Sequence, residues 1–190
     1  MRDDIQSLRA ENQELRDRVR SLEEQVRFLG QHRTLAAGIT GEQLVANLVG
    51  GHLTSHGAPH DIEVRGELVE VKFAKLSRPN RSAPTLRWQW QKIYGERGGK
   101  AYDHLLLVGE TDPRFSSFYL DPDSPFVFFL VPFAEARRLC IKGNPLGMTL
   151  NSNPVSARGS SVELFEKWQV TASEIERRFR LAGAEKSVQS

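Results

Sequence analysis

Cysteine is nearly absent from this chain, because Cys140 is the only one among its 190 residues. A single thiol excludes a disulfide within the chain and a zinc site built from cysteines. Long apolar stretches are missing too, and the longest, residues 126–133, is far too short to cross a bilayer. No apolar stretch follows the first four residues, so we expect no signal peptide, no membrane association and a location in the reducing cytoplasm.

An excess of charge of one sign is also lacking. The 26 basic and 24 acidic residues leave a formal net charge of +2 with the histidines neutral. This balance excludes a uniformly basic surface, so any surface that binds nucleic acid has to be local. Beyond the heptad pattern of its first 33 residues, the sequence contains no internal repeats and no low-complexity segments. Its length and its hydrophobic fraction of 39% suit one globular core with an appendage.

The appendage is the N-terminal segment, residues 1–33, which carries a heptad repeat. Its a positions are Ile5, Asn12, Val19 and Val26, and its d positions are Leu8, Leu15, Leu22 and Leu29. β-Branched residues at a and leucine at d favour a parallel two-stranded coiled coil, and an asparagine at one a position supports the same pairing. We therefore predict a homodimer. The alternative is a helix that packs this apolar seam on its own domain.

The stretch from Pro59 to Phe73 alternates apolar and polar residues on both sides of Gly66, which predicts a β-hairpin. With a two-residue turn at Gly66-Glu67, Glu63 would pair with Glu70, and Asp61 with Lys72. Directly opposed residues share a face of the sheet. One face would then carry Asp61, Glu63, Glu70 and Lys72, and the other would carry Ile62, Val64, Val69 and Val71.

A polar face with several carboxylates points to a hard metal ion. Carboxylates held close together repel and raise one another's pKa, and a divalent cation removes that cost. Mg²⁺, or Mn²⁺ in its place, prefers carboxylate oxygens and keeps several waters. Lys72 would lie beside such an ion and could orient a water or stabilise charge on a phosphate. The alternative is a solvated strand face with ordinary salt bridges.

At this point the sequence shows a resemblance. Asp61, followed after eight intervening residues by Glu70-Val71-Lys72, resembles the signature of the PD-(D/E)XK, or restriction-endonuclease-like, nuclease superfamily. Thr40–Leu44 is similar to the first helix of that superfamily, and Tyr102–Val108 to its next core strand. Pro59 stands two positions before Asp61, where related proteins often have a proline directly before the aspartate.

The resemblance implies a fold and a set of catalytic residues. The fold would be an α/β mixed sheet flanked by helices. Asp61 and Glu70 would bind the metal, Lys72 would act on the attacking water, and Glu42 could complete the metal site. The first-turn position of Glu42 has an alternative explanation, which is a favourable contact with the helix dipole. Whether Glu63 joins the metal site stays open.

Helices and strands alternate along the rest of the sequence, which predicts an α/β sandwich around a mixed sheet. The predicted helices are 40–49, which begins at a Thr40-x-x-Gln43 capping box, 85–95, 132–140, 161–168 and 172–182. The predicted strands are 52–56, 103–109, 118–120, 126–131 and 147–150. We place the catalytic domain at residues 34–183 and a flexible tail at residues 184–190.

Candidate DNA contacts follow the predicted hairpin. Lys75, Arg78 and Arg81 lie in a basic loop and could neutralise phosphates, while arginine can also read base edges. Arg87, Gln91 and Lys92 are candidates in the predicted helix 85–95. The resemblance places Gln89, Gln91 and Lys92 near the position where related nucleases carry a helical Gln or Lys that supports the scissile phosphate, and Gln91 and Lys92 are the favoured pair. Arg158, in a polar loop further along, is another candidate. The alternative for the basic loop is an ordinary solvated loop.

The sequence thus predicts a Mg²⁺-dependent homodimeric endonuclease that cuts double-stranded DNA, with restriction of foreign DNA as its first candidate role. A homing, phage-borne or repair endonuclease of the same fold is the next candidate. A different class is a nuclease fold that only binds DNA, and a further one is a coiled-coil scaffold. The recognition sequence and the stagger of the cuts cannot be read from these residues.

Overall fold

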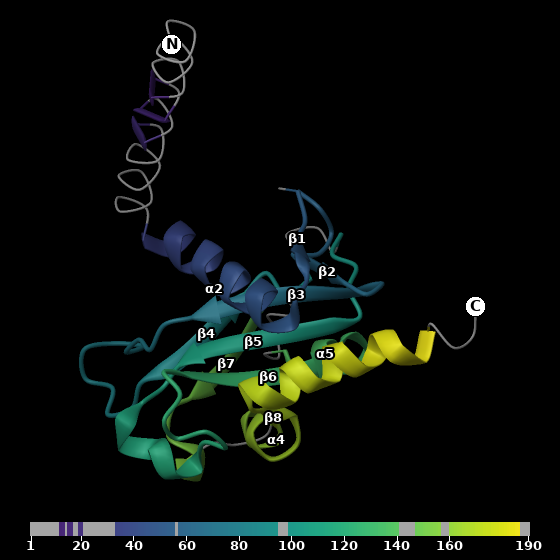
Figure 1. Ribbon diagram of the computed structural model, residues 1–190. Coiled ribbons are helices and arrows are strands. Elements are labelled where there is room, and N and C mark those ends of the chain that lie inside the picture. The colour runs from purple at the N-terminus through teal and green to yellow at the C-terminus, as the bar shows by residue number, and fades with distance from the viewer. Residues whose placement is uncertain are drawn as a thin grey trace, which may run out of the picture. The chain divides into compact units, whose positions relative to one another are not determined.

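The computed structural model (Figure 1) separates into two compact units, Met1–Ile39 and Thr40–Ser190. It describes residues 12, 13, 15, 16, 19, 20, 33–55, 57–94, 99–140, 147–156 and 160–186. In the first unit the six described residues between 12 and 20 are all helical, and Leu15 and Val19 expose 55% and 54% of their surface. The remainder of the predicted heptad segment before Arg33 lies outside the described residues, as do Arg158 and the last four residues of the predicted tail.

The second unit is built on a mixed sheet with the strand order β1-β2-β3-β5-β6-β8. Strands β3 and β5 are parallel, and the other neighbours in this sheet are antiparallel. The strands are β1 (His52–Leu53), β2 (Ile62–Val64), β3 (Glu67–Ala74), β5 (His104–Glu110), β6 (Phe126–Pro132) and β8 (Gln169–Val170). The predicted α/β class, with a mixed sheet flanked by helices, is confirmed.

The hairpin of β2 and β3 forms where it was predicted, but with a different turn. Ile62 pairs with Val69 and Val64 with Glu67, so the turn is Arg65-Gly66 and the predicted turn Gly66-Glu67 is wrong. Arg65 and Gly66 have φ of 51° and 78°, the positive values of a type I′ turn, which favours glycine at its second central position. Each residue's partner therefore moves by two positions, which leaves every side chain on its predicted face.

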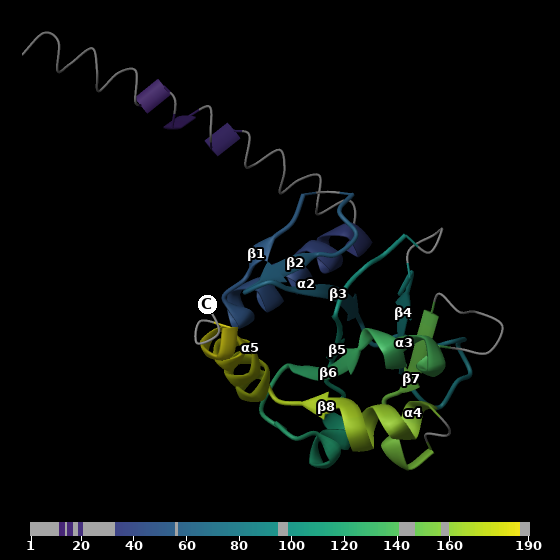
Figure 2. The ribbon, with the colours of Figure 1, turned by 90° about the vertical axis from the view of Figure 1, so that its right-hand side faces the viewer.

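One face of the sheet is covered by two helices, α2 (Arg33–Val49) and α5 (Ala172–Lys186), as Figure 2 shows. Val45 of α2 and Phe179 of α5 pack in one apolar cluster with Val69 and Val71 of β3. Helix α2 comes so close to β3 that a Cβ on Gly41 would lie 2.7 Å from the Cβ of Phe73. Because α2 begins at Arg33, Thr40 lies inside the helix and the predicted capping box at Thr40 is wrong.

The opposite face is covered by a second, two-stranded sheet and by helical segments (Figure 2). Trp88 and Trp90 of this small sheet are fully buried against Phe129 of β6 and Leu107 of β5. The covering elements are β4 (Arg87–Gln91), β7 (Gly147–Asn151), α3 (Phe133–Leu139), α4 (Ser160–Glu163) and the π-helical turn Leu164–Trp168. Two 3₁₀ turns, Pro113–Phe118 and Pro154–Ser156, complete the described elements.

Strand β4 corrects the prediction of a helix at 85–95. Trp88 and Trp90 are buried whereas Gln89 and Gln91 are exposed, an alternation with the period of a strand. Tryptophan also favours strands. Strand β4 makes its backbone hydrogen bonds with β7, which lies almost sixty residues further along the chain. The predicted strand 118–120 is wrong as well, because this segment is the end of a 3₁₀ turn and a bend.

The C-terminal helix begins as predicted. The Thr171 hydroxyl accepts from the Glu174 backbone N–H at 3.1 Å, and the Glu174 carboxylate accepts from the Thr171 N–H at 2.8 Å. These reciprocal bonds form the capping box that the sequence predicted. The helix continues to Lys186, so residues 184–186 of the predicted tail are helical. In the part of the chain that the structure describes, no helix has the length and apolar character needed to span a membrane.

Candidate active site

Four charged side chains meet on the β4–β7 side of the main sheet. Glu70 projects from the middle of β3 and is fully buried, on the strand face opposite Val69 and Val71. Lys72, two residues further along the same face, pairs with its Oε1 atom. Asp61 comes directly before β2, where the observed register, continued by one residue, sets it beside Glu70. Its Oδ2 atom accepts a hydrogen bond of 2.9 Å from the Val71 N–H.

The fourth member, Lys100, was missed by sequence reasoning. Its Nζ atom lies 2.8 Å from Glu70 Oε2 and 3.3 Å from Asp61 Oδ1, so one ammonium bridges both carboxylates. The segment around it is held by two backbone bonds: Lys100 N–H donates to Tyr94 O at 3.3 Å, and Ala101 N–H donates to Pro59 O at 3.1 Å. In the sequence, Lys100 follows two glycines, a setting typical of a turn. The signal that could have identified it as a site residue was weak: a lysine shortly before a predicted buried strand.

The local electrostatics follow from burial and from this pairing. Burial raises the pKa of Glu70 from 4.5 to about 6, with the nearby Asp61 charge adding to the rise and Lys72 and Lys100 opposing it. Burial by itself lowers the pKa of Lys100, but the hydrogen bond to Glu70 and the charges of Asp61 and Glu70 outweigh it, so this pKa is raised overall. The cluster therefore holds a buried acid that a cation stabilises in its charged form.

Asp61 and Glu70 fit a divalent metal in their chemistry and placement. Both supply carboxylate oxygens, the donors that Mg²⁺ prefers. The Lys100 ammonium lies within hydrogen-bond distance of both, so the structure already places a cation between the two groups. Within the described ranges, no group of three or more His, Cys, Asp or Glu side chains lies close enough together to hold a metal.

Glu42 and Glu63 lie apart from this pair. Glu42 belongs to α2, which packs on the face of β3 that carries Val69 and Val71, the face away from Glu70. Glu63 is exposed in β2, with Leu68 and His52 as its strand partners. The roles of these two residues as further metal ligands stay predictions.

The predicted DNA contacts lie along the connection from β3 to β4 and on β4 itself. Lys75 is 61% exposed and lies 3.9 Å from Glu110 Oε1, and Arg81 is exposed. Arg78 donates to Ala83 O at 3.1 Å, which orders the loop. The remaining three are Arg87, which is half-buried at the start of β4, Gln91, which is exposed at its end, and Lys92, which is exposed with φ of 58°.

Gln91 and Lys92 thus lie at the end of a strand, so the predicted helical support of a phosphate at this place is wrong. The outward positions of β4, which alternate with its buried tryptophans, still carry Arg87, Gln89 and Gln91 on one surface. In the sequence, this surface comes after the basic loop. Side chains arranged in this way could contact successive phosphates of a nucleic-acid backbone.

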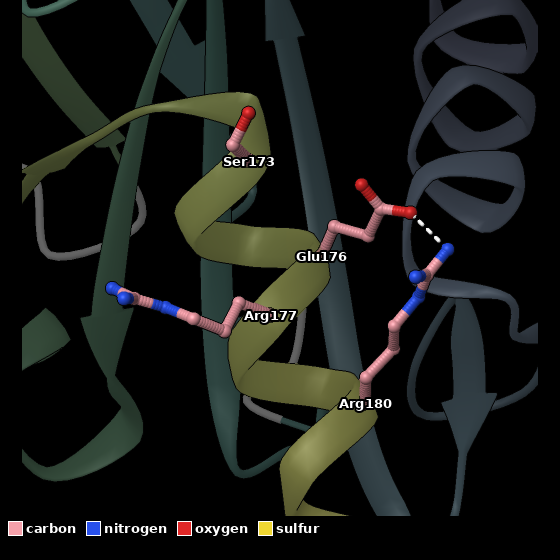
Figure 3. A pocket seen from close by; sticks show the side chains of 4 residues that line it. All are labelled: Ser173, Glu176, Arg177 and Arg180. Atoms are coloured by element: carbon pink, nitrogen blue, oxygen red, sulfur yellow. Dashed lines mark hydrogen bonds and ion pairs between the residues drawn. The ribbon is translucent and has the colours of Figure 1, made fainter.

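A hollow on α5 is a competing candidate site (Figure 3). It is lined by Ser173, Glu176, Arg177 and Arg180, and Figure 3 shows Glu176 and Arg180 turned toward one another with Arg177 directed away from them. All four residues come from one helix, on the sheet face away from Glu70. The hollow is open and brings together no groups from different elements, so the cluster around Glu70 is the stronger candidate.

No protein-family model matches the sequence, and no curated protein matches it at a significant level.

Proposed function

We propose that this protein is a metal-dependent DNA endonuclease of the restriction-endonuclease-like class that works as a homodimer. The observation that carries the proposal is the convergence of Asp61 and Glu70 on one cation, with Lys72 on the same face of β3. The strand order adds support, because β3, which carries Glu70-Val71-Lys72, lies next to β5, the strand that the resemblance assigns as the following core strand.

Each residue has a part in phosphodiester hydrolysis. Asp61 and Glu70 would hold Mg²⁺, which when bound supplies positive charge for the phosphate and acidifies water. Lys72 would hold the attacking water in line with the scissile bond. The water would lose a proton to the surrounding solvent as its oxygen forms a bond to phosphorus, the bond to the leaving oxygen would break, and that oxygen would take up a proton from solvent. The burial of Glu70 strengthens these charge interactions, because a buried site has a lower effective dielectric constant than water.

The substrate we propose is double-stranded DNA. Lys75, Arg78 and Arg81 would contact phosphates from the loop after β3, and Arg87, Gln91 and Lys92 would extend this surface along β4. A parallel coiled coil would relate two such domains by a two-fold axis, which suits a two-fold DNA site cut once on each strand. Restriction of foreign DNA is the first role we propose, and homing, phage-borne or repair cleavage is the next.

The test is cleavage of a supercoiled plasmid with Mg²⁺ and with EDTA in its place. We expect nicked and linear products with Mg²⁺ alone. Lys72→Ala should lower the cleavage rate by at least about 100-fold, the cost of removing one preorganised charge from a transition state, while DNA binding persists in a filter or gel assay. Lys167→Ala is the matched control, and this variant should cleave like the wild type. Lys167 is an exposed lysine that pairs with Glu163, and both residues are far from Lys72 in the sequence.

Cleavage that survives Lys72→Ala would contradict the catalytic roles. A second function, DNA binding without cleavage, is favoured by one observation: Lys72 and Lys100 together already balance the charges of the two carboxylates. This second function predicts that the wild type binds DNA equally well in Mg²⁺ and in EDTA and leaves the plasmid supercoiled in both.

A further inference from the structure

The Lys100 ammonium takes a position that a metal would need. It contacts one oxygen of each carboxylate, Asp61 Oδ1 and Glu70 Oε2, whereas the Lys72 ammonium contacts Glu70 alone. A magnesium ion binds carboxylate oxygens at about 2.0–2.1 Å. An ammonium held at 2.8 and 3.3 Å from the same two oxygens would crowd and repel it. The two cations therefore exclude each other from the space between Asp61 and Glu70.

The charge of the cluster leads to the same conclusion. Two carboxylates face two ammonium groups, so the four side chains are neutral together without any ion. The cluster is also largely shielded from water, since Glu70 exposes none of its side chain and Asp61 and Lys100 expose 15% and 21%. A divalent ion added to an already neutral, shielded cluster gains little attraction, whereas the two carboxylates with Lys72 alone would attract it strongly.

We propose that Lys100 is an internal competitor for the metal: its ammonium occupies the cation position of the metal-free protein, and a divalent ion binds only by displacing it. This inference rests on the metal site of the proposed function but not on DNA cleavage. Lys100 therefore sets the metal affinity. It also keeps Asp61 and Glu70 aligned when no metal is bound, because it is the one described side chain that contacts both.

The local structure permits the displacement. Lys100 reaches the carboxylates through a flexible four-carbon chain from a loop residue, whereas Lys72 is fixed within strand β3. The backbone of the loop stays tied to Tyr94 O and Pro59 O whether or not the ammonium moves. We therefore expect the side chain to leave by rotation about its own bonds, with the backbone held in place.

The experiment is a titration with Mn²⁺, followed through the loss of the free-ion signal in electron paramagnetic resonance, on the full chain without DNA. We expect Lys100→Met to bind Mn²⁺ about 10- to 100-fold more tightly than the wild type, the scale on which neighbouring groups tune metal affinity. Glu70→Gln in the same background should abolish this binding. Lys167→Met, the same change at an exposed lysine 3.8 Å from Glu163, should bind like the wild type.

A second measurement needs no variant and covers the case in which Lys100→Met does not fold. An amine-acetylating reagent, with the products mapped by mass spectrometry, reports how accessible each lysine is. We expect Mn²⁺ to increase the rate at which Lys100 of the wild type is acetylated and to leave the rate at Lys167 unchanged.

The outcomes separate this inference from the proposed function. Tighter Mn²⁺ binding by Lys100→Met in a protein that cuts no DNA would support the inference and contradict the nuclease. Equal or weaker binding by the variant, or an acetylation rate at Lys100 that saturating Mn²⁺ does not raise, would overturn the inference and leave the nuclease standing. Absence of Mn²⁺ binding in both proteins would overturn both the inference and the proposed metal site.

Discussion

At the scale of single residues, the properties of the candidate site depend on one buried acid. Glu70 is enclosed because it lies in the middle of β3, between an antiparallel and a parallel neighbour, with the small sheet covering its face. A carboxylate in that position is costly unless cations surround it, and two lysines do so. Its pKa of about 6 shows that the compensation is incomplete, because burial still disfavours the charged form.

This pKa predicts how stability depends on pH. Between pH 4.5 and about 6 the unfolded chain has lost the Glu70 proton while the folded protein retains it, so the folded state binds more protons. Its contribution to stability is therefore present below pH 4.5 and is lost as the pH rises to about 6. The total loss is about 2 kcal/mol, from a shift of roughly 1.5 units at 1.36 kcal/mol each.

Urea unfolding of the wild type and of Glu70→Gln across this pH range, in EDTA, measures the effect. The difference between the two free energies of unfolding reports on Glu70 together with the charges coupled to it, Asp61, Lys72 and Lys100, because the more distant acids contribute equally to both proteins. We expect the wild type to lose stability relative to Glu70→Gln as the pH rises. Parallel curves would show that Glu70 ionises in the folded protein as it does in the unfolded chain.

At the scale of elements, the packing of β4 on β5 decides whether the small sheet can cover the site. The Trp88 indole lies against Gly109 and donates to Glu110 O at 2.8 Å. A Cβ on Gly109 would come within 2.5 Å of Trp88 Nε1, which is closer than atoms can approach. Glycine in this strand is thus required by the close approach of a large side chain.

Gly109→Ala should therefore destabilise the protein by about 1–3 kcal/mol, the cost of overpacking a filled core. Gly99→Ala is the matched control, because its new methyl group would enter open space, and it should stay within about 0.5 kcal/mol of the wild type. Chemical denaturation of both variants checks the difference. Equal stabilities of the two variants would show that Trp88 does not press on β5 in this way.

The local sequence pattern was sufficient to predict some of these elements and insufficient to predict others. The alternation around Gly66 placed Asp61, Glu70 and Lys72 on one side, and this held because the observed register differs from the predicted one by two residues, an even shift that keeps each side chain on its face. It could not select the partners, which depend on Arg65 adopting a positive φ. Strand β4 was read as a helix because its partner β7 is distant in sequence. Lys100 carried no pattern, since only the folded chain brings it to Glu70.

At the scale of the whole molecule, the predicted coiled coil would give the exposed apolar residues of the N-terminal segment a partner. Leu15 and Val19 occupy d and a positions of the heptad and are more than half exposed in a single chain. Burying such residues stabilises by about 1.5–3 kcal/mol each, so we expect the predicted seam of four heptads to associate strongly. A second copy of the same helix is the partner that the heptad and Asn12 favour.

Leu15→Asp should convert the expected dimer into a monomer, because it places a charge at the centre of this seam. Gln13→Asp is the matched control, since position 13 is an outer b position of the same heptad. Light scattering coupled to size-exclusion chromatography measures the mass of each. A monomeric wild type, or a Leu15→Asp protein that stays dimeric, would contradict the parallel coiled coil.

The long sequence separation between Lys100 and the β2–β3 hairpin has a consequence for the order of folding. The hairpin that carries Asp61 and Glu70 can form from local contacts, but Lys100 lies 39 and 30 residues beyond them. Contacts of long range in sequence form slowly, because the intervening chain must first be ordered. As the chain leaves the ribosome, the hairpin that carries the acidic pair therefore emerges before Lys100, its bridging ammonium. During that interval, a divalent ion from the surrounding solution would reach the two carboxylates without competition from the Lys100 ammonium.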